Sequence, residues 1–295
     1  MINMTSASDA KTILVTGASG HIGRAVCRVL RAANRALLPI DRDPEGTPDV
    51  LVCDLRSKDD ISKLFRAERI HTMIHLAGVL RSASYAEPLT GADVNLSGSC
   101  ELMRQAAAAR VKRVIFASSL SVYGSLPSVR ALTENDPAAP DEPYGASKLV
   151  VELIGEALAK KGTFEFIALR IARVVGPGIK KTSSPWRSQI FDARPRLDSV
   201  SIPFSPEARL SLIHVEDVAR VLFTLAEAPK MNSFVYNTPA EIWEVRKLKE
   251  LIEERKGIRV QLEPGGSHGG PTCDGSRLVR EFGFQLHELD DYLSV

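Results

Sequence analysis

Tyr144 and Lys148 are the residues whose types and spacing most directly suggest chemistry in this chain. They are four residues apart, so on a helix their side chains share one face. A phenol has an unperturbed pKa near 10, and a nearby ammonium group stabilises the phenolate and lowers that pKa. A shift of about three units corresponds to about 4 kcal/mol, which a close cation in a partly dry site supplies. The pair is therefore expected to exchange a proton with a substrate hydroxyl; the alternative is an exposed helical pair without function.

Ser119 is the second candidate for chemistry. It closes the apolar run at 113–118, and Ser121 follows in a serine-rich turn. A serine at the carboxyl end of a strand points into the ligand crevice of an open α/β sheet. Its hydroxyl can donate a hydrogen bond to a carbonyl oxygen that develops negative charge. The alternative is local capping of the turn.

Three glycines, Gly17, Gly20 and Gly23, occupy the junction between an apolar run and a helical pattern. Glycine lets the backbone turn with positive φ, approach a pyrophosphate and pack closely against the strand. The N–H groups at the helix N-terminus, here at His21 and Ile22, attract phosphate. The first gap is one residue wider than in the usual dinucleotide fingerprint, so a plain βα turn is an alternative. The strand before and the helix after favour a bound dinucleotide.

Two acidic residues follow the next predicted strands. Asp41 is placed to accept hydrogen bonds from the adenosine ribose and to repel a 2′-phosphate. This favours NAD over NADP, although Arg42 beside it could hold that phosphate instead. Asp54, which precedes Leu55, is placed to accept from the adenine amino group. The alternatives are a turn residue for Asp41 and a helix N-cap for Asp54.

Short apolar runs alternate with longer helical stretches as far as Arg170. Continuous apolar strands separated by helices are typical of a parallel sheet covered on both faces. The predicted strands are 12–16, 36–40, 50–52, 72–76, 113–118 and 165–170. The predicted helices are 21–33, 58–67, 89–110 and 147–161. The sequence therefore predicts a doubly wound α/β sheet.

The pattern changes beyond Arg170. Residues 174–209 are rich in Pro, Ser and Arg and show little periodicity, which is typical of a lid or binding loop. Regular elements then return as helices 214–228, 244–255 and 276–282, strands 233–236 and 258–262, and a glycine-rich loop at 264–270. We expect a dinucleotide-binding core of residues 11–173, to which 211–236 return, and a substrate-binding region formed by 174–210 and 237–295.

Composition excludes several classes of protein. A net charge of +2 with scattered Arg and Lys argues against a nucleic-acid partner. The four cysteines form no Cys-x-x-Cys pair, so we expect neither a thiolate metal site nor a disulfide framework. There is no run of about 18 apolar residues and no apolar leader near Met1. We expect a soluble cytoplasmic protein without a metal or a membrane partner.

Further motifs accompany these residues. They are Thr16 to Gly23, His75-Leu76-Ala77-Gly78, Asn95, Ser118-Ser119 with Val122-Tyr123-Gly124, Tyr144-Gly145-Ala146-Ser147-Lys148, Arg170 through Gly176-Pro177-Gly178, and Ile213 to Val218. Together they resemble the extended short-chain dehydrogenase/reductases, most closely the NAD-dependent epimerase/dehydratase branch. The resemblance extends from Lys11 to about Val279.

The resemblance implies a Rossmann-type doubly wound parallel sheet with a smaller C-terminal substrate-capping region. By position, Ser119 matches the catalytic serine or threonine, Tyr144 the general acid/base, and Lys148 the residue that binds the nicotinamide ribose and tunes the tyrosine. The implied cofactor is NAD, bound by Gly17, Gly20, His21, Ile22, Gly23, Asp41, Asp54, Leu55, Leu76, Ala77, Gly78, Tyr144 and Lys148. The resemblance also implies a homodimer formed through helices 89–110 and 147–161.

Departures from the family pattern narrow the implied reaction. Leu120 and Ser121 stand where the dehydratases of this branch carry Asp and Glu, which disfavours dehydration. Arg173 stands where the epimerases usually have Asn, and Leu210 where an Arg usually precedes the matching His by four residues. The candidate substrate-binding residues are Ser119, Ser121, Arg173, Arg187 and Arg209. The arginines could grip a diphosphate or a carboxylate, or lie solvated on the surface.

Three functions are compatible with this pattern. The first is sugar-nucleotide epimerisation with tightly held NAD. The second is dehydrogenation or reduction of a small polyol, sugar acid or keto substrate, with NAD released in each cycle. The third is a cofactor-sensing protein without turnover, against which Ser119, Tyr144 and Lys148 argue, since a sensor needs the glycines but not the proton relay.

Overall fold

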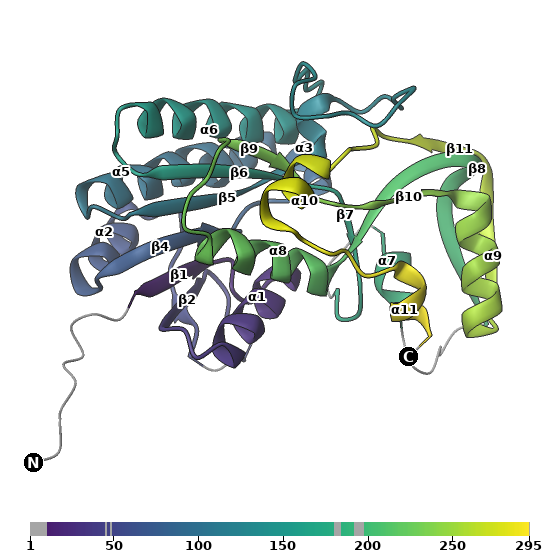
Figure 1. Cartoon of the computed structure of the whole chain (residues 1–295), viewed down its shortest axis with the longest axis horizontal. Helices are drawn as coiled ribbons and strands as arrows, with labels where there is room; N and C mark the ends of the chain where they lie inside the picture. Colours follow the sequence, from purple (N-terminus) through teal and green to yellow (C-terminus); the bar gives the residue numbers. More distant parts are fainter. Residues whose placement is uncertain (1–10, 45, 48, 180–183, 192–197, 295) are drawn as a thin grey trace, which may run out of the picture.

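The computed structural model describes residues 11–44, 46–47, 49–179, 184–191 and 198–294. Its strands form two sheets, which Figure 1 shows next to each other. The large sheet is parallel and has seven strands in the order β3-β2-β1-β4-β5-β6-β9. The small sheet has four strands: β8 pairs with β10 on one side and β11 on the other, and β7 also pairs with β8. The predicted fold class is confirmed.

The large sheet carries helices on both faces, as its continuous apolar strands predict. Its strands are β1 (Thr12–Thr16), β2 (Leu37–Asp41), β3 (Leu51–Val52), β4 (Ile70–His75), β5 (Arg113–Ser119), β6 (Glu165–Ile171) and β9 (Val235–Asn237). On one face, α1 (His21–Ala32) and α8 (Val215–Glu227) pack in a core with Val15, Ile115 and Leu169. On the other, α2 (Lys58–Ala67), α5 (Ser99–Ala108) and α6 (Pro143–Lys160) pack with Leu14, Val114 and Phe166.

The small sheet has a core of its own. Its strands are β7 (Arg173–Val175), β8 (Ser199–His214), β10 (Glu241–Glu244) and β11 (Arg259–Gly269). The helices packed with it are α7 (Trp186–Gln189), α9 (Val245–Lys256) and α11 (Leu289–Leu293). Trp186, Phe204 and Leu248 lie in this core and are at most 6% exposed. Helix α10 (Ser276–Phe282), which precedes α11, packs against β9 of the large sheet instead.

The prediction of an irregular segment at 174–209 was wrong for much of its length. Most of β7, all of α7 and most of β8 lie within it, and residues 180–183 and 192–197 are outside the described residues. Val200, Ile202 and Phe204 alternate along β8 with more exposed residues, but Pro203 and Pro206 hide the period. The glycine-rich loop expected at 264–270 likewise belongs largely to β11, because pairing with β8 decides its conformation.

The predicted helices near the catalytic motif have different limits. The stretch 89–110 contains most of α4 (Pro88–Ala92), the π-helical turn η2 (Asp93–Gly98) and α5, and it is preceded by the unpredicted α3 (Arg81–Ala86). Helix α6 begins at Pro143 and not at 147, which places Tyr144 in its first turn.

Within the described part of the chain, no helix is long and apolar enough to cross a membrane. The same residues contain no cluster of three or more His, Cys, Asp or Glu suited to a metal ion.

Candidate active site

The catalytic candidates lie at the end of β5 and the start of α6. Ser119 is the last residue of β5, and Tyr144 follows Pro143 at the first position of α6, where proline loses no helical hydrogen bond. Gly145 lets the helix approach the turn after β5, since a Cβ there would lie 2.3 Å from Ser121 O. This close approach brings the side chain of Tyr144 near the hydroxyl of Ser119.

The state of the phenol follows from its surroundings. Burial raises the pKa of Tyr144 to about 12; the nearby Ser119 hydroxyl lowers this pKa and the charge of Glu142 raises it, both to a smaller extent. At neutral pH the phenol therefore keeps its proton. In this arrangement Tyr144 is poised to donate a proton to an oxygen, and it needs an added positive charge to act as a base.

Lys148 lies one turn further along α6 and is 4% exposed. Its Nζ donates to Ala117 O at 2.9 Å and lies 4.6 Å from the centroid of the Phe116 ring and 5.6 Å from that of Tyr144. Burial lowers the pKa of Lys148 to about 8, and Glu152 acts to raise it. The expected lowering of the Tyr144 pKa by Lys148 is not found here, because the ammonium group is held by the end of β5 and burial of the phenol dominates.

The turn between β1 and α1 fits a phosphate group. Gly17 has φ 69°, and a Cβ on Gly23 would lie 2.0 Å from Gly17 O. Among the described residues no side chain caps α1 at Gly20, and the first turn holds no acidic residue, so its N–H groups can face an anion. A cavity of about 450 Å³ lies beside His21, lined also by Gly178. These residues fit the pyrophosphate of a dinucleotide.

A buried network that the sequence did not single out holds the loop after β4. Thr16 Oγ1 accepts from the amides of Leu76 and Ala77 at 3.2 and 3.0 Å and hydrogen-bonds His75 Nδ1 at 2.7 Å. His75 Nε2 in turn lies 2.8 Å from Ser99 Oγ. Burial lowers the pKa of His75 to about 3, so the ring is neutral and accepts at Nδ1 while Nε2 donates. The sequence did contain a signal for this network. Thr16 and His75 are polar residues at the ends of two apolar runs, and these runs become neighbours because β1 and β4 pair in parallel.

Asn95 holds the same loop from its other side. Its Oδ1 accepts from Val79 N at 2.7 Å, and its Nδ2 donates to Val79 O at 2.9 Å. A Cβ on Gly78 would lie 3.0 Å from Asn95 Oδ1 and 3.5 Å from Lys148 Nζ. The loop predicted to lie beside the cofactor therefore contacts the buried lysine closely.

The two acidic candidates have different surroundings. Asp41 Oδ2 accepts from Ser19 N at 3.0 Å, which joins it to the glycine turn. Asp54 instead pairs with Arg56, whose Nη2 lies 2.5 Å from Asp54 Oδ2, and hydrogen bonding to Arg56 lowers the pKa of this carboxyl. An adenine amino group would have to share Asp54 with that guanidinium. The alternative of an N-cap at Asp54 is wrong, because Ser57 caps α2.

The remaining apolar candidates contribute to packing. Leu55 is 7% exposed and lies in the core beneath α2. Ile22 and Leu76 pack against the opposite core. Any contact of these three with a cofactor would come from their backbone or from one edge of the side chain.

The structure brings Arg173 and Arg187 together. The Arg173 guanidinium lies 4.8 Å from the centroid of the Phe204 ring and makes no hydrogen bond or ion pair with any described residue. Arg187 Nη1 donates to Val174 O at 3.4 Å, next to Arg173 in the chain. Burial, followed by the charges of Arg187 and Arg81, lowers the pKa of Arg173 to about 10. An anion at this position would relieve the repulsion.

The other two substrate candidates lie differently. Arg209 is exposed on β8, whereas Leu210 after it is 2% exposed and lies in the core of the small sheet. Arg209 is therefore not grouped with Arg173 and Arg187, which are only partly exposed. Ser121 lies in the turn η3 (Leu120–Tyr123), and its amide donates to Ser119 Oγ at 3.1 Å.

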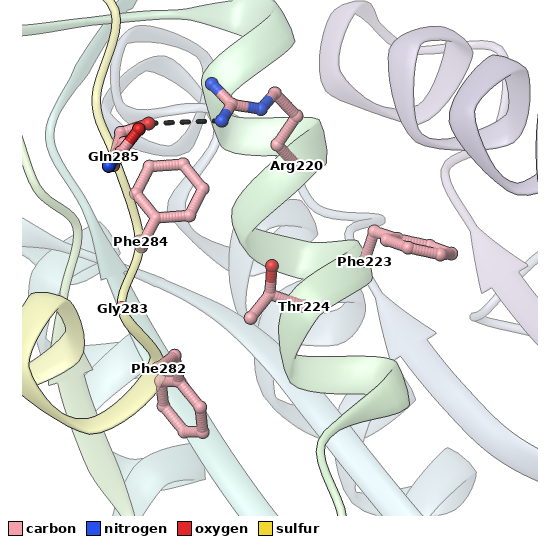
Figure 2. A pocket seen from close by; sticks show the side chains of 7 residues that line it. All are labelled: Arg220, Phe223, Thr224, Phe282, Gly283, Phe284 and Gln285. Carbon is pink, nitrogen blue, oxygen red and sulfur yellow. Dashed lines mark hydrogen bonds between the residues drawn. The ribbon is translucent and has the colours of Figure 1, made fainter.

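A further pocket, of about 290 Å³, lies between α8 and the segment after α10 (Figure 2). Arg220 Nη2 donates to Gln285 O at 3.1 Å across it, and its guanidinium lies 4.9 Å from the centroid of the Phe284 ring. None of the catalytic or cofactor candidates lines this pocket.

A parallel sheet with a glycine turn suited to phosphate at one strand end, and with Ser119 and Tyr144 beside buried Lys148 at another, is typical of a dinucleotide-dependent enzyme. The family model described as "NAD dependent epimerase/dehydratase family" matches residues 13–237, and the chain belongs to this family. UDP-glucose 4-epimerase 2 of Oryza sativa subsp. japonica is 28% identical over 308 aligned positions, which cover 91% of this chain and 75% of that protein.

Solved structures of similar fold include members of this kind of enzyme. MoeE5 in complex with UDP-glucose and NAD is 29% identical with a TM-score of 0.81, over 96% of each chain. The L-threonine 3-dehydrogenase of Trypanosoma brucei has a TM-score of 0.85 over 96% of this chain and 94% of that one, and at 22% identity it shows the fold alone. The predicted family and the predicted NAD cofactor are confirmed, and the chain is an NAD-dependent enzyme of the epimerase/dehydrogenase type.

Proposed function

We propose that this enzyme epimerises a sugar nucleotide by reversible hydride transfer at a carbinol carbon. The observation that carries the proposal is that Tyr144, at the start of α6, faces Ser119 at the end of β5, with the Nζ of buried Lys148 5.6 Å from the centroid of the Tyr144 ring. The similarity to UDP-glucose 4-epimerases supports it. In this proposal Gly17, Gly20, His21, Ile22 and Gly23 hold the pyrophosphate of the cofactor.

In this proposal, the side chains of Ser119, Tyr144 and Lys148 carry out the proton transfer. Tyr144 exchanges a proton with the reacting hydroxyl, and Ser119 donates a hydrogen bond to the same oxygen as it gains carbonyl character. The charge of Lys148 stabilises the phenolate when Tyr144 has lost its proton. NAD supplies a hydride acceptor when it is bound. The oxidised sugar turns within the site and is reduced on its other face.

The remaining cofactor contacts are assigned on the same basis. Asp41 binds the adenosine ribose, and Asp54 with Leu55 lies at the adenine. The loop Leu76, Ala77 and Gly78 borders the nicotinamide side. The region formed by residues 174–210 and 237–295 covers the substrate, with the core at 11–173 and 211–236 beneath it. Because the thiols of Cys27, Cys53 and Cys273 are free and buried, a reducing cytoplasmic location suits the protein.

A second candidate, NAD-dependent oxidation of a small sugar acid, is favoured by one feature. Leu210 is buried in the small-sheet core where the epimerases usually carry an arginine, so the chain lacks that grip on a diphosphate. Arg173 meanwhile offers a guanidinium that lies over the Phe204 ring and makes no hydrogen bond or ion pair with a described residue. A guanidinium binds a carboxylate as well as a phosphoryl group, in both cases with two parallel hydrogen bonds.

Substitution Arg173→Gln is expected to raise KM for an anionic substrate by about 10- to 100-fold, the worth of one hydrogen bond to a charged group. The bound NAD content should not change. UDP-glucose, UDP-glucuronate and free glucuronate serve as probes: equal losses on both nucleotides indicate a diphosphate contact, and a loss confined to the two acids indicates a sugar carboxylate. Arg209→Gln is the matched control on an exposed arginine. Unchanged KM for all three probes would remove Arg173 from substrate binding.

The reaction itself is tested with the purified protein. We expect denaturation to release about one NAD per chain and UDP-glucose to be converted to its 4-epimer without net NADH, since an epimerase returns its hydride in every cycle. Accumulation of NADH with a sugar acid, and little retained cofactor, would favour the dehydrogenase. If none of the three probe substrates gives either an epimer or NADH, both proposed reactions are contradicted.

We also propose a homodimer formed through α3, α4, η2, α5 and α6. Large apolar side chains are exposed on this side: Tyr85 is 75%, Leu89 82%, Val150 40% and Leu153 58% exposed. Helices α3 and α4 contact α6, so these residues belong to one surface. Large apolar side chains exposed on helices that contact one another are typical of an association site, and the second copy is the occupant that the family resemblance implies.

Leu153→Glu is expected to yield a monomer. Loss of about 2 kcal/mol per buried leucine, twice in a symmetric dimer, weakens association by about 1,000-fold. Sedimentation velocity measures the mass of the species in solution. Val279→Glu on α10, where the side chain is 37% exposed, is the control and should leave the mass unchanged. A chain that is monomeric without substitution would contradict the proposal directly.

A further inference from the structure

Glu152 anchors a charged cluster that is buried behind the catalytic residues. The side chains of Ser118, Glu152 and Arg170 come from β5, α6 and β6 and are 3%, 3% and 5% exposed. Glu152 Oε1 accepts from Ser118 Oγ and from Arg170 Nε, the latter at 3.1 Å. Glu152 Oε2 accepts from Arg170 Nη2 at 2.7 Å.

This cluster is costly for a purely structural element. Two buried charges lose their hydration. A protein with well-packed apolar residues of similar volume in their place is often equally stable. Arg170 Nη1 is, in addition, buried with no hydrogen-bond partner among the described residues. Its guanidinium stacks 4.8 Å from the centroid of the Tyr123 ring. Stability alone therefore does not account for a carboxylate at this position.

The cluster contacts both sides of the catalytic group. Ser118 immediately precedes Ser119, so the hydrogen bond to Glu152 fixes the strand end that carries the catalytic hydroxyl. The carbonyl of Ala117, one residue earlier, accepts from Lys148 Nζ at 2.9 Å. Glu152 is also one helical turn beyond Lys148 on α6, on the same face.

The charges around Lys148 are few. Glu152 raises the pKa of Lys148 against the lowering by burial, and the resulting value is about 8. His75 faces the lysine from β4 as a neutral ring, and Tyr144 faces it as a protonated phenol. Arg170 pairs with the carboxylate of Glu152, whereas Lys148 Nζ donates its own hydrogen bond to Ala117 O.

We propose that Glu152 is a positioning residue for the reaction, which keeps Lys148 charged at the working pH and holds the end of β5 that carries Ser119. The inference rests on the proposed roles of Lys148 and Ser119. The titration of Lys148 can nevertheless be measured without any substrate, so this inference and the proposed reaction can fail separately.

The test follows Lys148 in the full-length, cofactor-free protein. The ¹³C shift of its Cε, in lysine-labelled protein and assigned with Lys148→Arg, gives the titration midpoint. Glu152→Gln retains the size of the side chain and an oxygen that accepts from Ser118, but it lacks the charge. The midpoint is expected to fall by about one unit or more. Ser118→Ala removes the hydrogen bond and leaves the charge, so the midpoint should stay at its original value.

Activity gives a second readout. The ammonium form is lost as the pH rises through the midpoint, so in Glu152→Gln the alkaline limb of kcat/KM should move to lower pH by the same amount. An unmoved midpoint in Glu152→Gln, or an equal shift in Ser118→Ala, would overturn the proposal. If the unpaired Arg170 prevents folding, Glu152→Gln/Arg170→Met removes both charges. A downward shift of the Lys148 midpoint in that double variant supports the proposal. An unshifted midpoint in the double variant refutes it.

Discussion

Tyr144→Phe is expected to lower turnover by about 1,000-fold, within the range typical of a lost general acid/base. The phenol is the group poised to exchange the proton, and phenylalanine keeps its ring but removes the hydroxyl beside Ser119. Bound NAD should be almost unchanged, because the glycine turn and Asp41 are distant in sequence and carry the proposed pyrophosphate and ribose contacts. Turnover is measured with the best substrate of the panel, and NAD is measured after denaturation.

The matched control for this variant is Tyr85→Phe. Tyr85 is 75% exposed on α3 and carries no proposed proton, so turnover should not change. Near-normal turnover in Tyr144→Phe, with Tyr85→Phe equally active, would remove the tyrosine from the mechanism. Loss of NAD together with turnover would show a structural effect instead.

Gly23→Ala is expected to abolish retention of NAD and to destabilise the protein by about 1–3 kcal/mol. The added Cβ would lie 2.0 Å from Gly17 O and 2.8 Å from Ala18 Cα, and backbone atoms cannot move aside cheaply. The glycine turn must therefore shift away from α1, and the cofactor loses its phosphate contacts. Calorimetric titration with NAD and the urea midpoint of unfolding measure the two effects.

Gly162→Ala provides the control for the added methyl group. Gly162 has φ +73°, and nothing lies within 4 Å of its Cβ position, so backbone strain is present without a clash. We expect it to lower stability slightly and to leave NAD binding intact. If Gly23→Ala bound NAD as well as Gly162→Ala does, the turn would not be the cofactor site.

Local pattern was sufficient for the parts of the chain whose conformation depends on near neighbours. The apolar runs that became β1, β4, β5 and β6 and the glycines between β1 and α1 are such parts. The spacing of Tyr144 and Lys148 also follows from one helix, although its first turn begins earlier than the pattern suggested because proline is well suited to that position. Strand ends at one edge of a parallel sheet then bring Ser119, Thr16 and His75 to one side.

The rest of the fold depends on strands that pair although they are far apart in the sequence. Strands β7, β8 and β11 join residues far apart in the chain, and prolines and glycines obscure the alternation, so the local pattern indicated only the first part of β11 and not the small sheet. The charge states are equally non-local: burial raises the pKa of Tyr144 to about 12 and lowers that of Lys148 to about 8, because neighbours from several elements exclude water. By itself the sequence determined the large sheet and the family, and it supplied the candidate catalytic residues Ser119, Tyr144 and Lys148. Only the tertiary structure decided their protonation, the buried pair of Glu152 and Arg170, and the grouping of Arg173 with Arg187, since these depend on what each side chain meets after folding.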